Sequence, residues 1–349
     1  GNLTAGGGAL GIGGASAVGA GKLVVTNGNV FAHGADRVIG SNLDLTTNAV
    51  NGWLGDYGLT FNGNNVLTGT GTTSLTVTTN NSIATGKSLT LNGVTSGAGA
   101  NRTWTVDGTG ETIINGVFTS STAFGVAISK TGNGILTLGT NGTTSNWNLA
   151  GNNVTLNRGV LKFTNDNAIP SATAANGGLV MNPAAAVGAT ATLDLNGTTQ
   201  TVNAFTGNTN GILKIDNTSA SAATFRFGAN NAGIDFGSGV GTYSVLNTGT
   251  GSLSLVKLGN TSATFISGIT LAHKGITASE GGGVFTLASP VTATTGLRVI
   301  EASTLALTGG LPNGNLITSV EVGGGSSLSL LDGAGNKLPN LTSLSLGNT

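Results

Sequence analysis

The sequence is informative first for what it does not contain. Cysteine is absent, proline accounts for only 5 of 349 residues, charged residues for 7% and aromatic residues for 5%. Because there is no cysteine there are no disulfides, so stability has to come from hydrogen-bonded ladders and packing. No run of 18 apolar residues occurs, which excludes a transmembrane helix, and we expect no membrane span.

The charge of the chain is low and balanced. Its 13 basic and 13 acidic side chains give a formal net charge of zero, and no segment gathers lysine and arginine into a patch that would neutralise phosphates. We therefore expect no nucleic-acid partner. A near-zero net charge also removes the self-repulsion that keeps chains apart, which favours association of this chain with itself, end to end or laterally.

Short apolar segments, separated by turns rich in glycine, asparagine and threonine, recur along almost the whole chain. In each segment apolar residues alternate with threonine, serine, asparagine or a single charge, which is the pattern of a β-strand with one buried face. The segments are centred on Leu23/Val25, Leu43/Leu45, Leu59/Phe61, Leu75/Val77, Leu89/Leu91, Trp104/Val106, Leu136/Leu138, Leu193/Leu195, Leu213/Ile215, Phe225/Phe227, Leu253/Leu255, Leu305/Leu307, Leu328/Leu330 and Leu344/Leu346. Helical signals are nearly absent, so the sequence predicts an all-β protein.

The spacing of these strands varies while their pattern stays constant. Leu75 and Leu89 are 14 residues apart, whereas Leu23 and Leu43 are 20 residues apart. Such spacing fits the coils of a β-solenoid, an elongated rod whose corners accept insertions, better than it fits a sandwich. Asparagine at equivalent corners predicts stacked amide ladders and left-handed turns. The coil register stays open, because a slip of two residues keeps the same face inward.

The chain starts at Gly1, and its single methionine is Met181. We therefore expect residues 1–349 to be a single β-solenoid segment of a longer precursor. The last predicted strand, 341–346, is followed by the turn residues 347–349, which indicate that another strand follows. Open coil ends of this kind are templates for a further strand, either from more of the same protein or from another copy.

Three stretches carry a more specific pattern. The first is Lys-Thr-Gly-Asn-Gly-Ile-Leu-Thr-Leu at 130–138, followed after a Gly/Asn/Thr-rich stretch by 153–163, which contains Gly-Val-Leu; residues 192–207 and 256–277 read the same way. This pattern resembles the autotransporter-associated β-strand repeat of large secreted bacterial passenger proteins, and residues 126–287 match it best. The resemblance implies a right-handed parallel β-helix that is extracellular or on the cell surface and serves as a stalk, adhesive or matrix element.

Right-handed β-helices also include polysaccharide lyases and hydrolases, which need clustered carboxylates. The acidic residues here are scattered, and Asp44, Asp194 and Asp216 are expected at outward positions as isolated, solvated charges. His33 and His273 lie far apart in sequence, so neither a catalytic triad nor a histidine metal site is indicated. We expect no catalytic residues, no metal, no cofactor and no enzymatic activity.

Aromatic side chains are the residues that would stack on sugar rings. Trp104 alternates with Val106 in a strand pattern, and we expect it in the core. Trp53 and Tyr57, in the segment 51–57, are the candidate ligand-contact pair. The competing interpretation, which we favour, is that these two rings pack to close a corner of a thin core.

The function that these patterns favour is structural: an extracellular β-solenoid rod that forms part of a bacterial surface fibre, stalk or matrix and assembles with itself end to end. The first alternative is an adhesin segment that binds surface glycans or cells. The second alternative is a polysaccharide-degrading β-helix enzyme, in which stacked coils would bring two carboxylates together.

Overall fold

The computed structural model describes residues 1–46, 50–69, 75–97, 99–120, 124–139, 153–170, 178–182, 189–207, 211–229, 234–236, 242–246, 248–258, 263–265, 269–271, 275–278, 284–287, 296–299, 304–307, 319–323, 325–330 and 343–346. These residues contain no α-helix, and their strands pair in parallel into a β-solenoid. The predicted all-β parallel solenoid is thereby confirmed, and its right-handedness stays a prediction. The chain divides into two compact units, Gly1–Gly177 and Gly178–Thr349, and the single segment over 1–349 stays a prediction.

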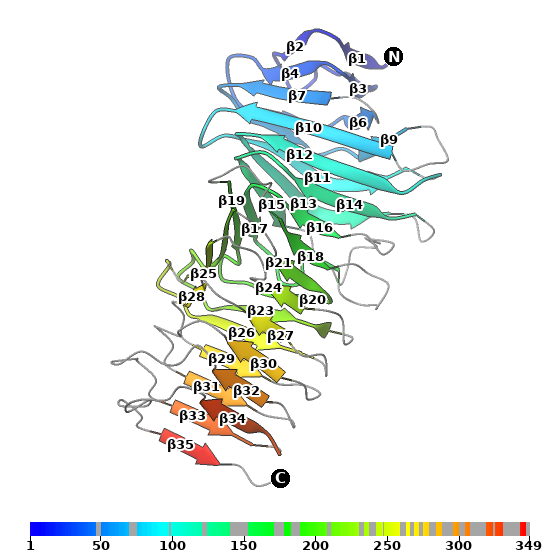
Figure 1. Ribbon diagram of the computed structural model, residues 1–349. Helices are drawn as coiled ribbons and strands as arrows, with labels where there is room; N and C mark the ends of the chain where they lie inside the picture. Colours follow the sequence, from blue (N-terminus) through cyan, green and yellow to red (C-terminus); the bar gives the residue numbers. More distant parts are fainter. Residues whose placement is uncertain are drawn as a thin grey trace. The chain divides into compact units, whose positions relative to one another are not determined.

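In the first unit, the coils build two parallel sheets. The β12 sheet consists of β2 (Ala9–Ile12), β4 (Asn29–Ala32), β7 (Val50–Gly55), β10 (Leu75–Ile83), β12 (Arg102–Gly108), β14 (Val126–Lys130) and β16 (Val154–Leu156). The β11 sheet consists of β1 (Leu3–Gly6), β3 (Lys22–Thr26), β6 (Asn42–Thr46), β9 (Asn65–Thr68), β11 (Ser88–Ser96), β13 (Glu111–Thr119), β15 (Ile135–Gly139) and β17 (Gly159–Phe163). In addition, β8 (Leu59–Phe61) pairs with β11, and β5 (Arg37–Ile39) pairs with β8. Figure 1 shows β7, β10, β12 and β14 stacked with their arrows aligned.

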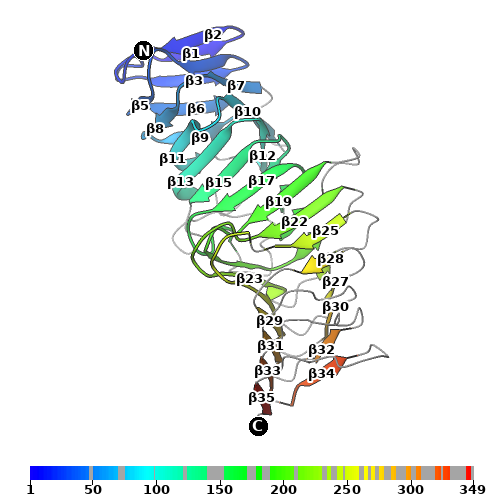
Figure 2. The same ribbon diagram turned by 90° about the vertical axis from the view of Figure 1, so that its left-hand side faces the viewer.

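In the second unit, the described strands form three parallel sheets. The β22 sheet consists of β19 (Thr190–Asp194), β22 (Ile212–Asp216), β25 (Thr242–Val245) and β28 (Ile269–Leu271). The β21 sheet consists of β18 (Leu179–Met181), β21 (Phe205–Gly207), β24 (Ile234–Phe236), β27 (Ala263–Phe265), β30 (Val284–Leu287), β32 (Thr304–Leu307) and β34 (Ser327–Leu330). The β23 sheet consists of β20 (Thr199–Val202), β23 (Ala223–Phe227), β26 (Leu253–Lys257), β29 (Gly275–Ala278), β31 (Gly296–Val299), β33 (Ser319–Val322) and β35 (Ser343–Leu346), and Figure 2 shows its later strands in a column.

The core consists of apolar rows that run from strand to strand. Val77, Trp104, Ile128 and Val154 are register partners across β10, β12, β14 and β16, and none is more than 1% exposed. Burial of each such side chain stabilises the fold by about 1.5–3 kcal/mol. All predicted strand centres lie in described strands except Leu195, which follows the end of β19 and is still buried. Leu346 departs from the pattern, because it lies in β35 but is 73% exposed.

Polar side chains tie neighbouring coils together at the strand ends. The Thr46 hydroxyl donates a hydrogen bond of 2.9 Å to the carbonyl of Val25, one coil away. The Asn92 amide donates to Oδ1 of Asn62 at 2.5 Å, and Asn92 is also the register partner of Asn115. Left-handed backbone occurs at Asn27, Asn167 and Asn196, with φ of 62°, 49° and 46°. The predicted left-handed asparagines are therefore confirmed. The predicted amide ladders stay a prediction, since the Asn92–Asn62 bond joins a single pair of amides.

Candidate functional site

Trp53 is a core residue and not part of an exposed aromatic pair. Its side chain is 0% exposed, and its ring meets the edge of Phe61 with ring centroids 5.6 Å apart. The candidate ligand-contact pair is therefore wrong for Trp53, since a buried indole cannot stack on a sugar. The packing interpretation is confirmed for this ring, as it is for Trp104, whose Nε1 donates to Oγ1 of Thr79 at 2.9 Å.

Tyr57 lies apart from Trp53, on the turn between β7 and β8, and is 37% exposed. The same corner of the neighbouring coils carries Asp36, between β4 and β5, and Lys87, between β10 and β11. Asp36 accepts a hydrogen bond of 2.9 Å from the backbone N–H of Gly58 and forms a 2.7 Å ion pair with Lys87. The Lys87 hydrogen bond and then the Gly58 N–H hold the pKa of Asp36 below its usual value. We name Asp36, Tyr57 and Lys87 the Tyr57 corner.

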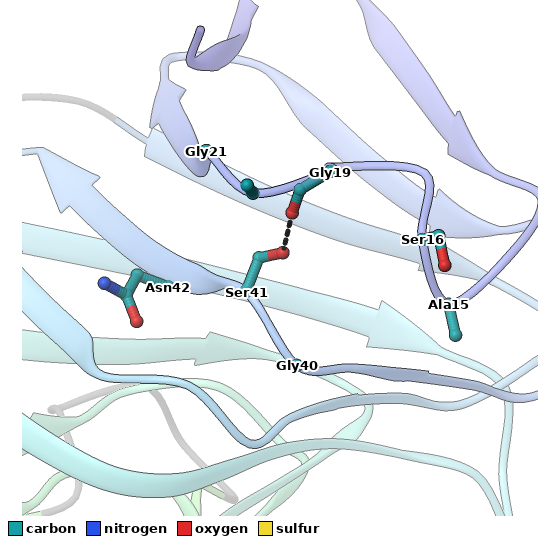
Figure 3. Close-up of a pocket in the computed structure, with 8 residues that line it drawn as sticks. Ala15, Ser16, Gly19, Gly21, Gly40, Ser41 and Asn42 are labelled. Atoms are coloured by element: carbon teal, nitrogen blue, oxygen red, sulfur yellow. Dashed lines mark hydrogen bonds between the residues drawn. The ribbon is translucent and has the colours of Figure 1, made fainter.

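A hollow of about 580 Å³ opens near the start of the first unit. Figure 3 shows it between the turn that carries Ser16 and Gly19 and the segment that carries Ser41, whose hydroxyl donates to the Gly19 carbonyl at 2.7 Å. Its lining is Ala15, Ser16, Gly19, Ala20, Gly21, Gly40, Ser41 and Asn42. This lining carries neither a charge nor an aromatic ring, so it offers little that would orient a specific ligand.

The acidic residues expected on the outside are buried. Asp44, Asp194 and Asp216 are only 6%, 4% and 6% exposed, so the expectation of solvated charges is wrong. Asp194 accepts hydrogen bonds from the Thr218 N–H at 3.2 Å and the Thr218 hydroxyl at 2.8 Å. Asp216 accepts from the Thr248 N–H at 3.0 Å and the Thr248 hydroxyl at 2.8 Å. The turn of the following coil thus closes over each carboxylate.

Asp194 and Asp216 are register partners in β19 and β22. Each carboxylate accepts hydrogen bonds from a threonine of the next coil, and Asp194 also accepts one from the N–H of Asn196 in its own turn. The two aspartates therefore form a repeated corner clamp between stacked coils. Asp44 is ion-paired with Lys22 of the preceding coil. The alternation of residues along a strand does not predict these contacts, because the donors come from turns that are distant in sequence.

Three buried cations were missed by reading the sequence. Arg102, Lys130 and Lys257 are 1%, 1% and 0% exposed. Arg102 donates from Nη1 to the carbonyls of Gly97 at 2.5 Å and Ala100 at 2.8 Å, and Lys130 donates from Nζ to the carbonyl of Gly132. Burial lowers the pKa of Arg102 and Lys257, and lowers the pKa of Lys130 to about 8, while the charge of Asp107 acts in the opposite direction.

A sequence signal for the Lys130 position existed. Val126, Ile128 and Lys130 alternate along β14, so the period of two places the lysine on the same inward face as the two apolar residues. Lys257 follows Leu253 and Leu255 in β26 in the same way. In both strands the charge comes directly before a corner, where backbone carbonyls are available to accept hydrogen bonds.

No metal-binding or membrane-spanning group was found in the part of the chain that the structure describes. The described residues contain no cluster of three or more histidine, cysteine, aspartate or glutamate side chains. His33 lies exposed after β4, and His273 lies outside the described residues. No described helix has the length and apolar character needed to cross a membrane.

Comparison with known proteins found no matching family model, no matching curated protein and no matching solved structure. The resemblance of residues 126–287 to autotransporter-associated repeats therefore stays a prediction.

Proposed function

We propose that this chain is a structural protein, a β-solenoid rod that forms part of a bacterial surface fibre, stalk or extracellular matrix. The observation that carries the proposal is the set of fully buried apolar rows that link successive coils, such as Val77–Trp104–Ile128–Val154. Each coil of such a fold contacts its neighbours through a ladder and a row of packed side chains, so stability accumulates along the stack. A fold of this kind is suited to spanning distance and bearing load.

Force spectroscopy on the chain, held at its two ends, tests the mechanical role. Trp104 and Ile128 are register partners 24 residues apart, so one coil of this part of the chain contains about 24 residues. We expect extension in successive steps of about one coil, because each coil must be peeled from the next. A single low-force release of the whole chain would contradict a load-bearing role, and antibody labelling of intact source cells tests the proposed surface location.

Association of the chain with itself is part of the proposal. The formal net charge is zero, so the self-repulsion that keeps chains apart is absent. Stacked coils expose strand N–H and C=O groups along the solenoid axis, and such groups pair with a strand of a second copy where they meet. We expect light scattering to show mass that grows with concentration. A constant monomer mass at the highest accessible concentration would remove self-assembly from the proposal.

A second candidate function, an adhesin that binds a neutral surface glycan, is favoured by the Tyr57 corner. Its half-exposed tyrosine ring lies on the coil between those of Asp36 and Lys87, which form a polar ion pair. Tyrosine offers a flat apolar face with a polar edge, which suits a sugar ring. We expect Tyr57→Ala to abolish any binding to a neutral glycan array, whereas Val117→Ala, at another exposed position, leaves it unchanged. Equal binding by both variants would exclude this corner as the contact.

A further inference from the structure

The coil register of a β-solenoid has to be fixed by something other than the apolar pattern. A shift of one strand by two residues returns the same face to the core, so apolar rows by themselves tolerate it. Among the described residues of the first unit, Lys130 is one that makes registers two residues apart unequal. It lies at the end of β14, opposite Val106 of β12 and Leu156 of β16, and it is 1% exposed.

The position of Lys130 is acceptable only because a corner lies next to it. A buried ammonium is costly unless hydrogen bonds replace its water, and Nζ donates to the carbonyl of Gly132 at the corner. Among the described residues the corner carbonyl is the hydrogen-bond acceptor of this lysine, and the charge of Asp107 on the neighbouring strand also favours the ammonium form. The lysine thus marks the place where the strand ends.

A shift of β14 in one direction would bury this charge in the apolar row. If β14 moved so that Lys130 came opposite Trp104, Ile128 would come opposite Arg102. The ammonium would then lie two residues further from Asp107, in the row formed by Val77, Trp104 and Val154. The cost of an unpaired charge among apolar side chains excludes that register.

A shift in the other direction is blocked by backbone contact. Lys130 would then take the place of Gly132, where a Cβ atom would lie 2.1 Å from the carbonyl oxygen and 2.3 Å from the nitrogen of Gly108. Only glycine fits this position, since those distances are far shorter than any van der Waals contact. The glycine and the lysine therefore block opposite shifts.

We propose that Lys130 is a register lock, a residue whose buried charge specifies the pairing of β14 with β12 and does not serve to raise stability. Arg102 acts in the same sense from the opposite end of the same pair of strands. It lies opposite Leu75 and Val126 at the start of β12, held by loop carbonyls, and a shift of two residues toward the corner would carry its guanidinium into the Trp104 position. Buried polar groups that fix register at a cost in stability are known from coiled coils.

The absence of cysteine makes the register directly measurable in the full chain. In the observed register Thr105 faces Ser129, whereas Thr103 faces Ala127. The Thr103–Ser129 pair is diagonal, about 8 Å apart from the strand spacing and rise, which is too far for a disulfide. In the register that places Lys130 opposite Trp104, Thr103 and Ser129 face each other. Thr105→Cys/Ser129→Cys therefore reports the observed register, and Thr103→Cys/Ser129→Cys reports the shifted one.

We expect mild oxidation, read by peptide mass spectrometry, to cross-link only the first pair when Lys130 is present. In the Lys130→Met background we expect the cross-link yield of the second pair to rise at least tenfold. Lys162→Met, at a half-buried position on β17, serves as the matched control and should leave the yield at background. Lys130→Gln, which removes the charge and keeps a donor, gives a second test should the methionine variant not fold.

A background yield of the second pair in both folded Lys130 variants would overturn the proposal. Failure of both variants to fold, with Lys162→Met folded by circular dichroism, would overturn it as well, because a register lock directs pairing and is not needed for strands to form.

Discussion

The buried charge of Lys130 predicts that the chain becomes more stable as the pH rises above 8. The pKa of this lysine falls from 10.5 to about 8 on folding, because the ammonium leaves water. Between those two values the unfolded chain binds more protons than the folded chain, so the free energy of unfolding rises with pH. A shift of about 2.5 units at 1.36 kcal/mol per unit corresponds to about 3 kcal/mol between pH 7 and pH 10.5.

Urea unfolding followed by tryptophan fluorescence measures this change, since Trp104 is buried in the strand next to Lys130. Other groups titrate in the same range, and burial also lowers the pKa of Lys257, so the quantity to compare is the difference between the parent chain and Lys130→Met. We expect this difference to change by about 3 kcal/mol in favour of the parent chain from pH 7 to pH 10.5. A difference constant within about 0.5 kcal/mol would refute the reasoning, because it would mean that the lysine is solvated in the folded chain.

Three further changes test the packing of the coils. Gly134→Ala should lower the free energy of unfolding by at least about 2 kcal/mol, because its Cβ would lie 2.1 Å from the Gly110 carbonyl, whereas Asn133→Ala at the neighbouring exposed position should have little effect. Trp104→Phe should lower the free energy of unfolding by about 2 kcal/mol, because the core loses volume and Thr79 loses its hydrogen-bond donor. An unchanged urea midpoint would show that this bond is absent in solution. Asp194→Ala should cost about 2 kcal/mol, because the Thr218 N–H and hydroxyl lose their acceptor, while the exposed Asp56→Ala should match the parent in thermal denaturation; equal midpoints for both variants would contradict the clamp.

The strands could be predicted from the sequence because apolar and polar residues alternate along each one, which identifies its buried face. Trp104 and Val106 were placed in the core by that period alone, and both are buried. The same period also places Lys130 on the buried face. A charged residue is not expected there until the corner carbonyl that accepts its hydrogen bond is known. The burial of Asp194 could not be predicted from the sequence. It results from contact with Thr218 of the next coil, and the sequence around Asp194 does not indicate that contact.

The candidate site was harder to predict than the fold. Trp53 and Tyr57 are four residues apart, yet β7 ends between them at Gly55, so one ring enters the core and the other stays on the turn. Whether a residue falls before or after the end of a strand decides its environment, and strand ends are the least predictable part of a sequence pattern. The Asp36–Lys87 pair joins residues two coils apart and depends on the stacking of the coils.

Electron microscopy of the native material on the surface of the source cells tests the structural proposal most directly. We expect fibres or rods that contain this chain, with an axial repeat of about 4.8 Å, the spacing of stacked parallel strands. Compact particles without that repeat, or absence of the chain from the cell surface, would contradict the proposal that it is a structural β-solenoid of a surface fibre, stalk or matrix.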